Sequence, residues 1–120
     1  MPPLFVGSTP VVREGVTFDP GKATLLPDAK PMLERVARAL LAAPKMKVEV
    51  AGHTDNMGNP ASNLILSQRR ADAVRARLIQ LGVTSDQLTA RGYGSEVPLV
   101  PNTTRAGRAA NRRVEVKQVP

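Results

Sequence analysis

The sequence predicts an α+β fold in which helices pack on one face of a sheet. Two segments, residues 28–43 and 63–81, carry apolar residues three or four positions apart, which is the spacing of amphipathic helices. Residues 46–52 and 114–117 alternate polar and apolar side chains, as half-buried strands do. The predicted order is strand, helix, strand, helix, strand, strand, and a sheet with helices on one face buries the apolar side of each element.

The first half of the predicted domain runs from a short strand at residues 16–18 to the helix at residues 28–43. The turn Asp19-Pro20-Gly21 ends this strand. Asp28 is the expected N-cap of the helix, and Pro31 falls in the first turn, where its missing N–H breaks no helical hydrogen bond. Pro44 is expected to stop the helix.

The second half begins with the strand at residues 46–52, which a polar loop follows. Asn63 is the expected cap of the second helix, and Gly82 is the expected residue just past its end. The remaining predicted elements are a strand at residues 88–93, a loop at Pro98 and Pro101, a helical turn at residues 103–110 and a closing strand at residues 114–117.

Composition bounds the classes of protein to which the chain can belong. Its 120 residues suit one domain, with residues 1–15 as a linker or N-terminal extension and residues 16–120 as the folded part. The longest uncharged apolar stretch, residues 39–43, is far shorter than the ~20 residues of a membrane-spanning helix. The absence of Cys excludes disulfides, thiolate metal sites and a cysteine nucleophile. The first residues lack a signal-peptide pattern, so we expect a cytosolic protein or a part of a longer exported one.

The net charge of +7 indicates an acidic partner, such as nucleic acid, an anionic surface or a carboxylate-rich polymer. Several of the basic residues lie near the C-terminus, namely Arg105, Arg108, Arg112, Arg113 and Lys117. This basic run forms either a solvated face or an anion-binding surface. Binding of nucleic acid is disfavoured, because no aromatic residues are interleaved with the basic ones.

Two features supply candidate binding residues. The loop Gly52-His53-Thr54-Asp55-Asn56 follows a strand, where ligands of α/β-type sheets often bind, although Asp and Asn are also turn formers. Arg70 lies in the apolar row of the second helix, where a guanidinium needs an anion unless it extends past the edge of that row. If this helix packs under the loop, Asp55 and Arg70 face one cleft, either as a salt bridge or as a clamp for a zwitterionic ligand.

Catalysis and metal binding receive little support from the residues. His53, the only histidine, has Asp55 as a possible second metal ligand but no evident third, and a structural hydrogen-bonding role is favoured. Ser62 and Ser67 lack the surroundings of a nucleophilic serine. We therefore expect no metal site, no cofactor and no enzyme activity.

A series of short motifs follows in order along residues 16–117. They are Phe18-Asp19, the loop GHTDN at residues 52–56, Asn63-Leu64, Leu66-Ser67, Arg70-Ala71, residues 88–94, Asn102-Thr103 and the segment GRAANRRVEV at residues 107–116. Together they resemble the OmpA-like peptidoglycan-binding domain, which OmpA-type porins, peptidoglycan-associated lipoproteins and flagellar stator B subunits share. A series of this length is a far more specific signal than any one of its motifs.

The resemblance implies a mixed four-stranded sheet with two main helices on one face, and non-covalent binding of peptidoglycan through the diaminopimelate of its stem peptide. The family's aspartate in the GHTDN loop matches Asp55, and its helix arginine matches Arg70. Thr54, Asn63 and Leu66 match flanking positions, and Phe18 and Asp19 match the other side of the pocket. The implied role is to anchor an outer-membrane or other envelope protein to the cell wall from the periplasm, with the membrane reached only through an upstream anchor.

Two other classes of protein stay open as alternatives. A basic nucleic-acid-binding domain would lose affinity steeply with salt and would be indifferent to Arg70. A cell-wall-acting enzyme would need two titratable groups over the bond it cleaves, for which His53 with Asp55 is the candidate pair. No oligomeric state follows from the sequence.

Overall fold

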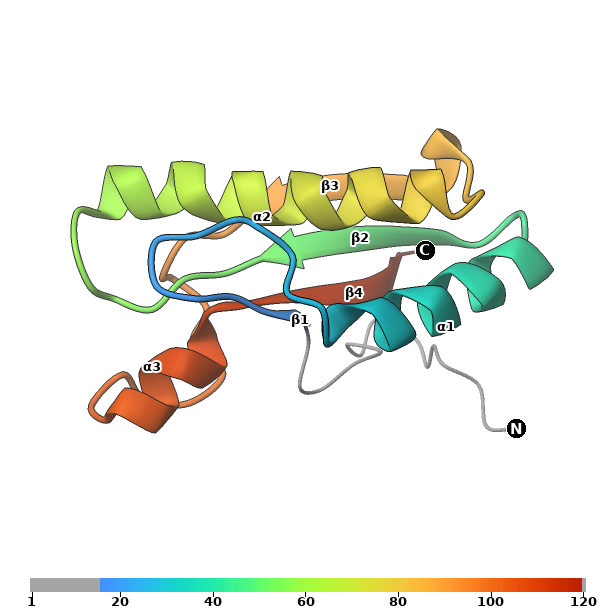
Figure 1. Ribbon diagram of the computed structural model, residues 1–120. Coiled ribbons are helices and arrows are strands. Elements are labelled where there is room, and N and C mark those ends of the chain that lie inside the picture. Colours follow the sequence, from blue (N-terminus) through green and yellow to red (C-terminus); the bar gives the residue numbers. More distant parts are fainter. Residues whose placement is uncertain (1–15, 120) are drawn as a thin grey trace.

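The computed structural model describes residues 16–119, which form a four-stranded sheet and three α-helices (Figure 1). The expected linker at residues 1–15 lies outside the described residues. Along the chain the elements are β1 (Val16–Thr17), α1 (Ala29–Ala42), β2 (Lys47–Gly52), α2 (Pro60–Gln80), the 3-10 helix η1 (Ser85–Gln87), β3 (Leu88–Gly92), α3 (Arg105–Asn111) and β4 (Arg113–Val119).

The sheet is mixed, with the strand order β1-β4-β2-β3. β2 is parallel to β3 and antiparallel to β4, and β1 pairs antiparallel with β4. α2 supplies the long crossover that joins the parallel strands β2 and β3. The predicted α+β fold with a mixed four-stranded sheet and two main helices is confirmed. The predicted helical turn is α3, a short third helix at one end of the sheet (Figure 1).

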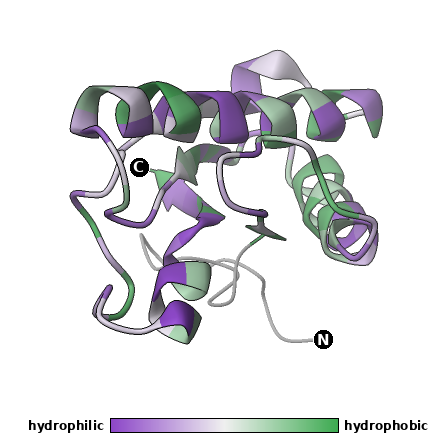
Figure 2. Cartoon of the chain, turned by 60° about the vertical axis from the view of Figure 1, so that its left-hand side comes forward, coloured by the Kyte–Doolittle hydropathy of each residue, from purple (hydrophilic) through white to green (hydrophobic). Residues whose placement is uncertain are grey.

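The core lies between one face of the sheet and the helices α1 and α2. Val48 and Val50 of β2 point to this face, as do Val114 and Val116 of β4, and all four are buried. The same cluster holds the buried helix residues Leu33, Val36, Leu40, Val74 and Leu78. Figure 2 shows hydrophilic and hydrophobic stretches alternating along α2, as expected of a helix that buries one side only.

α1 occupies the predicted segment with Asp28 at its N-cap position, as predicted, but the Asp28 side chain does not cap the helix. Asp28 precedes the helix with a helical backbone (φ −71°, ψ −12°), and its side chain makes no capping hydrogen bond. A capping side chain normally reaches the first N–H groups from an extended backbone, which Asp28 does not have. Pro31 lies in the first turn as predicted, and the helix ends before Pro44.

α2 begins three residues earlier than predicted, and Asn59 rather than Asn63 caps it. The Asn59 backbone is extended, and its Oδ1 accepts from the N–H groups of Ala61 (2.8 Å) and Ser62 (3.3 Å). Pro60 is the first helical residue, a position that proline favours because its φ is already helical. The sequence prediction treated Pro60 as part of the loop and therefore placed the cap one turn too late.

The strand boundaries differ from the predicted ones by small amounts. β1 ends at Thr17, so Phe18 lies just outside it, and β3 ends at Gly92, just before Tyr93. β4 runs from Arg113 to Val119 and is longer than predicted, because all of its residues from Val114 onwards pair with β2.

Glycine lets α2 lie directly on the end of β2. A Cβ on Gly52 would stand 2.0 Å from the carbonyl oxygen of Ser67 in α2. This is far inside van der Waals contact, so only a residue without a side chain fits. This close contact determines how near α2 lies to the end of β2 and to the loop that follows it.

Side chains of α2 also cover the outer edge of β3. The Gln68 amide donates from Nε2 to the Ala90 carbonyl (3.1 Å) and accepts at Oε1 from the Gly92 N–H (2.9 Å). Arg75 donates from Nε to the Leu88 carbonyl (3.1 Å). These groups satisfy backbone atoms that an additional strand would otherwise bind.

None of the helices in residues 16–119 is long and apolar enough to cross a membrane. α2, with 21 residues, has the length but carries charged side chains along its outer side, among them Arg69 and Asp72.

We predict that Gly52→Ala destabilises the domain by about 1–3 kcal/mol, the range of steric overpacking, because the new methyl group collides with the Ser67 backbone. Urea denaturation followed by circular dichroism measures the change. Gly58→Ala is the comparison, because Gly58 has φ +86° but no atom near its Cβ position, so that substitution adds backbone strain alone. A loss at Gly58 equal to or larger than that at Gly52 would contradict the role of close packing.

Candidate functional site

A cleft of about 450 Å³ opens between the loop after β2, the start of α2, the turn after β1 and α3. Its lining residues are Pro20, Gly21, Thr54, Asp55, Met57, Asn63, Leu66, Arg70, Arg105, Arg108 and Arg112. Five of the residues predicted for the site therefore line this cleft, namely Thr54, Asp55, Asn63, Leu66 and Arg70. Phe18 and Asp19 do not line the cleft, and the adjoining Pro20 and Gly21 do.

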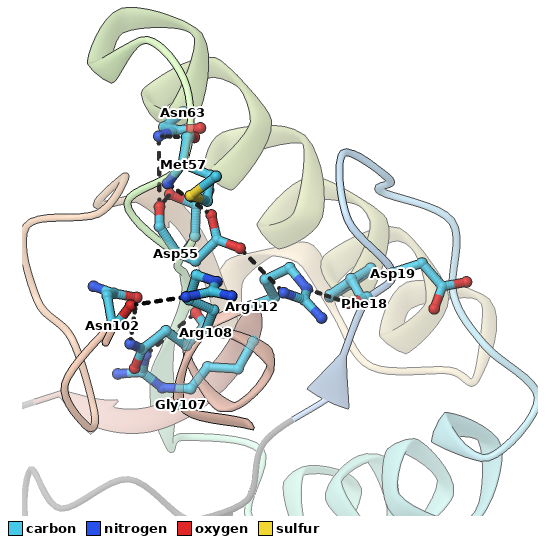
Figure 3. Close-up of polar contacts among 12 residues, drawn as sticks. Phe18, Asp19, Asp55, Met57, Asn63, Asn102, Gly107, Arg108 and Arg112 are labelled. Carbon is cyan, nitrogen blue, oxygen red and sulfur yellow. Dashed lines mark hydrogen bonds and ion pairs between the residues drawn. The ribbon is translucent and has the colours of Figure 1, made fainter. Parts of the chain in front are cut away.

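Asp55 is held by a local turn and by one arginine. Its Oδ1 accepts from the Met57 N–H (3.0 Å), which closes a turn within the loop. Its Oδ2 accepts from Nη1 of Arg112 (3.1 Å), as Figure 3 shows. The two side chains are only 12% and 15% exposed, so this ion pair is partly shielded from water. These two contacts orient the Asp55 carboxylate without a ligand.

The loop that carries Asp55 is tied to its surroundings on both sides. The Thr54 N–H donates to the Gly94 carbonyl (2.9 Å), and the Thr54 hydroxyl donates to the Asp55 carbonyl (2.8 Å). Asn63, in the first turns of α2, donates from its amide to the Met57 carbonyl (3.0 Å) and points toward the loop (Figure 3). Thr54 and Asn63 are both buried, and both therefore act on the shape of the loop.

Arg70 is fully buried, and its hydrogen bonds go to backbone carbonyls. Nε donates to Lys22 O (2.8 Å), Nη1 to His53 O (3.0 Å) and Nη2 to Asp19 O (3.1 Å). No carboxylate within residues 16–119 forms an ion pair with it, so the predicted alternative of a salt bridge with Asp55 is wrong. The alternative in which the side chain extends past the apolar row to solvent is also wrong, because Arg70 is fully buried. Carbonyl dipoles satisfy the buried guanidinium in place of an anion.

Burial, the larger cause, and the positive charge of Arg112 together lower the pKa of Arg70 to about 10, whereas Asp55 acts in the opposite direction. The guanidinium therefore remains protonated at neutral pH. Arg70, Arg112 and Asp55 form one electrostatic group, although Arg112 rather than Arg70 makes the direct contact with Asp55.

Phe18 and Asp19 contribute mainly through their backbones. The Phe18 carbonyl accepts from Nε of Arg112 (3.1 Å), and the Phe18 ring lies 5.2 Å from the Arg70 guanidinium carbon. The Asp19 carbonyl accepts from Arg70, while its carboxylate is exposed and points away from Asp55 in Figure 3. These two residues support the arginines from behind the cleft wall.

The sequence prediction missed Arg105, Arg108 and Arg112 as site residues. It assigned the C-terminal basic run either to a solvated face or to an anion-binding surface, without connecting the run to Asp55. The structure brings α3 and the start of β4 to the same cleft, where all three arginines contribute to the lining. The signal in the sequence was an excess of basic residues over the one nearby acidic residue, Glu115, and only the sheet order shows that the run also approaches Asp55.

His53 belongs to a buried polar cluster and not to the cleft. Its ring stacks on Tyr93 with centroids 5.4 Å apart, and its Nε2 lies 3.9 Å from Glu115, which accepts a 2.7 Å hydrogen bond from Arg113. Neither imidazole nitrogen has a hydrogen-bond partner, so the predicted hydrogen-bonding role is wrong for the side chain. The pair of His53 and Asp55 considered for acid–base chemistry is thereby separated. Among the described residues no group of three or more potential ligands could hold a metal ion.

Comparison with known proteins identifies the family of this chain. The model of the OmpA family matches residues 17–112, which is most of the chain. The chain belongs to the OmpA family. This confirms the family resemblance that the motifs indicated, and the matched segment contains both Asp55 and Arg70.

Relatives of this OmpA-family domain include larger envelope proteins. The chain is 46% identical to outer membrane porin F of Pseudomonas fluorescens over 87% of its own length but only 32% of the porin. It is 41% identical to the peptidoglycan-binding protein ArfA of Mycobacterium tuberculosis over 84% of its length and 31% of ArfA. The crystal structure of the peptidoglycan-associated lipoprotein from Burkholderia pseudomallei is similar, with a TM-score of 0.84, 33% identity and coverage of 87% of this chain and 88% of that one. The chain thus spans about a third of these two longer relatives and nearly all of the solved lipoprotein chain.

We predict that His53 makes the domain sensitive to mild acid. Burial lowers the pKa of His53 to about 3, with Arg113 and Lys117 acting in the same direction, whereas the unfolded chain has the ordinary value of 6.5. Below pH 6.5 the His53 side chain of the unfolded state therefore binds a proton, whereas that of the folded state stays neutral until the pH approaches 3. The contribution of His53 to the free energy of unfolding is fully retained above pH 6.5. Below that pH it falls by up to about 1.4 kcal/mol per pH unit.

Urea denaturation at pH 7, 6 and 5 tests this, with His53→Phe as the variant that keeps the ring stacking but cannot titrate. We expect the wild type to lose about 2 kcal/mol more than the variant between pH 7 and pH 5. Parallel losses in the two proteins would show that His53 is not the titrating group.

Proposed function

We propose that this domain binds peptidoglycan non-covalently, through the diaminopimelate of the stem peptide, and so anchors an envelope protein to the cell wall. The observation that carries the proposal is the cleft in which one carboxylate, that of Asp55, lies among the four arginines Arg70, Arg105, Arg108 and Arg112. Membership of the OmpA family supports it, as does similarity to the peptidoglycan-binding protein ArfA and to a peptidoglycan-associated lipoprotein.

The charges of the cleft complement an amino-acid head group. Meso-diaminopimelate ends in one ammonium and one carboxylate, and Asp55 is the acceptor for the ammonium. Arg70 is the partner for the carboxylate, because its five N–H groups make three hydrogen bonds in the structure and two are left for a ligand. Arg70 is fully buried, so we infer that the exposed Pro20–Gly21 rim moves aside when the ligand enters.

The same charges would discriminate between wall types. A lysine-type stem peptide has the side-chain ammonium but not the second carboxylate. In the cleft it would satisfy Asp55 and leave Arg70 and Arg112 without a new anion, while adding a further positive charge to an already cationic site. Binding should therefore favour diaminopimelate over lysine.

The location follows from the same proposal. The relatives include an outer membrane porin and a lipoprotein, so we propose a periplasmic domain attached to the outer membrane or to another envelope anchor. A polymeric wall offers many stem peptides to an anchored domain, so modest affinity for each one is compensated by avidity.

We predict that Asp55→Asn raises the dissociation constant for meso-diaminopimelate at least about thirtyfold, which corresponds to the loss of about 2 kcal/mol at a shielded charge pair. Asparagine keeps the acceptor for the Met57 N–H, so the loop retains its turn. Calorimetric titration of the purified chain with meso-diaminopimelate, and with lysine in parallel, measures the effect.

Asp86→Asn is the matched control, since Asp86 is exposed in η1 and does not line the cleft. It should bind as the wild type does. Equal affinity of the wild type for diaminopimelate and lysine, or unchanged binding by Asp55→Asn, would refute the proposed recognition.

A further inference from the structure

α3 is held rigidly against the cleft. Thr104 caps it by accepting from the Gly107 N–H (2.9 Å), and a Cβ on Gly107 would stand 2.2 Å from the Pro101 carbonyl oxygen. At its other end Asn111, which is fully buried, donates to Val100 O and to Asn102 Oδ1, both at 2.8 Å. The short helix is thus fixed to the preceding segment at both ends, and the side chains it presents have a defined position.

Two of these side chains, Arg105 and Arg108, line the cleft without an acidic partner. Within residues 16–119 no carboxylate forms an ion pair with either one. Arg108 makes one hydrogen bond, to the Asn102 carbonyl at 3.3 Å, and in Figure 3 it lies on the same side of Asp55 as Arg112. Asp55 is already paired with Arg112, so it does not neutralise the arginines of α3.

We propose that Arg105 and Arg108 form a second anion subsite, which binds a carboxylate of the stem peptide outside its diaminopimelate head. This proposal rests on the proposed function and extends it. Guanidinium groups favour planar anions that can accept two parallel hydrogen bonds, and a carboxylate is such an anion. In the stem peptide the glutamate is joined to diaminopimelate through its γ-carboxyl group, so its α-carboxylate is free and stands one residue from the head group.

The α3 subsite differs from a general attraction between a basic domain and an acidic wall. General attraction depends on the number of charges and weakens with salt, whichever arginines are removed. A subsite depends on the position of the arginines and on one carboxylate of the ligand. The two accounts therefore predict different results when the protein and the ligand are altered together.

The experiment uses two tripeptides, Ala-γ-Glu-diaminopimelate with a free glutamate α-carboxylate and the same peptide with that carboxylate amidated. The full chain and the double variant Arg105→Gln/Arg108→Gln are titrated with both tripeptides and with free meso-diaminopimelate. The matched control is Arg35→Gln/Arg69→Gln, which removes two positive charges from exposed positions on α1 and α2 that do not line the cleft.

We expect the α3 double variant to bind the free-acid tripeptide about tenfold more weakly than the wild type does, as befits a charge-assisted contact. Its loss of affinity for the amidated tripeptide and for free diaminopimelate, which both lack the glutamate α-carboxylate, should be much smaller than for the free acid, and the wild type should bind the amidated tripeptide about tenfold more weakly than the free acid. The control double variant should follow the wild type throughout.

Equal losses for both tripeptides, or the same loss in the control variant, would overturn the subsite in favour of general attraction. A failure of the proposed function looks different, because the wild type would then bind neither free diaminopimelate nor either tripeptide. Circular dichroism of the α3 variant confirms that it is folded.

Discussion

The buried guanidinium of Arg70 is the interaction on which the site depends. It joins three segments that are distant in the sequence, because it donates to Asp19 and Lys22 in the turn after β1 and to His53 in the loop after β2, while it is itself part of α2. A neutral side chain has too few N–H groups to donate to three carbonyl oxygens at once. The walls of the cleft are therefore joined by a buried charge that hydrogen-bonds to backbone carbonyls, which gives Arg70 a structural role.

The neighbouring charges are arranged around this buried one. Arg112 lies beside Arg70, bonds to the Phe18 carbonyl and holds Asp55 in place, so the acid and the bases of the cleft orient one another. Because one aspartate faces four arginines, the cleft keeps a surplus of positive charge. A ligand that brings one ammonium and more than one carboxylate would balance it better than a neutral zwitterion.

Much of the fold could be predicted from the sequence, because the apolar spacing of α1 and α2 and the alternation in β2 report directly on which side is buried. The boundaries were less accurate where a proline was involved: Pro60 begins α2, although it resembles a loop residue in the sequence. Asp55 and Arg70 were predicted to share one cleft from their positions and from the family resemblance, and both line the cleft in the structure. The Asp55–Arg112 pair was not, because it depends on the antiparallel placement of β4 beside β2, which no local pattern encodes.

The amide of Gln68 affects whether a strand of another molecule can add to the sheet at β3. By offering one donor and one acceptor to Ala90 and Gly92, it imitates a single peptide unit of a fifth strand. A chain of another protein that approached this side would find those backbone groups already engaged and would have to displace α2 to reach them. These contacts, with that of Arg75 to Leu88, oppose the addition of a further strand at β3, as protected edge strands do in other sheets.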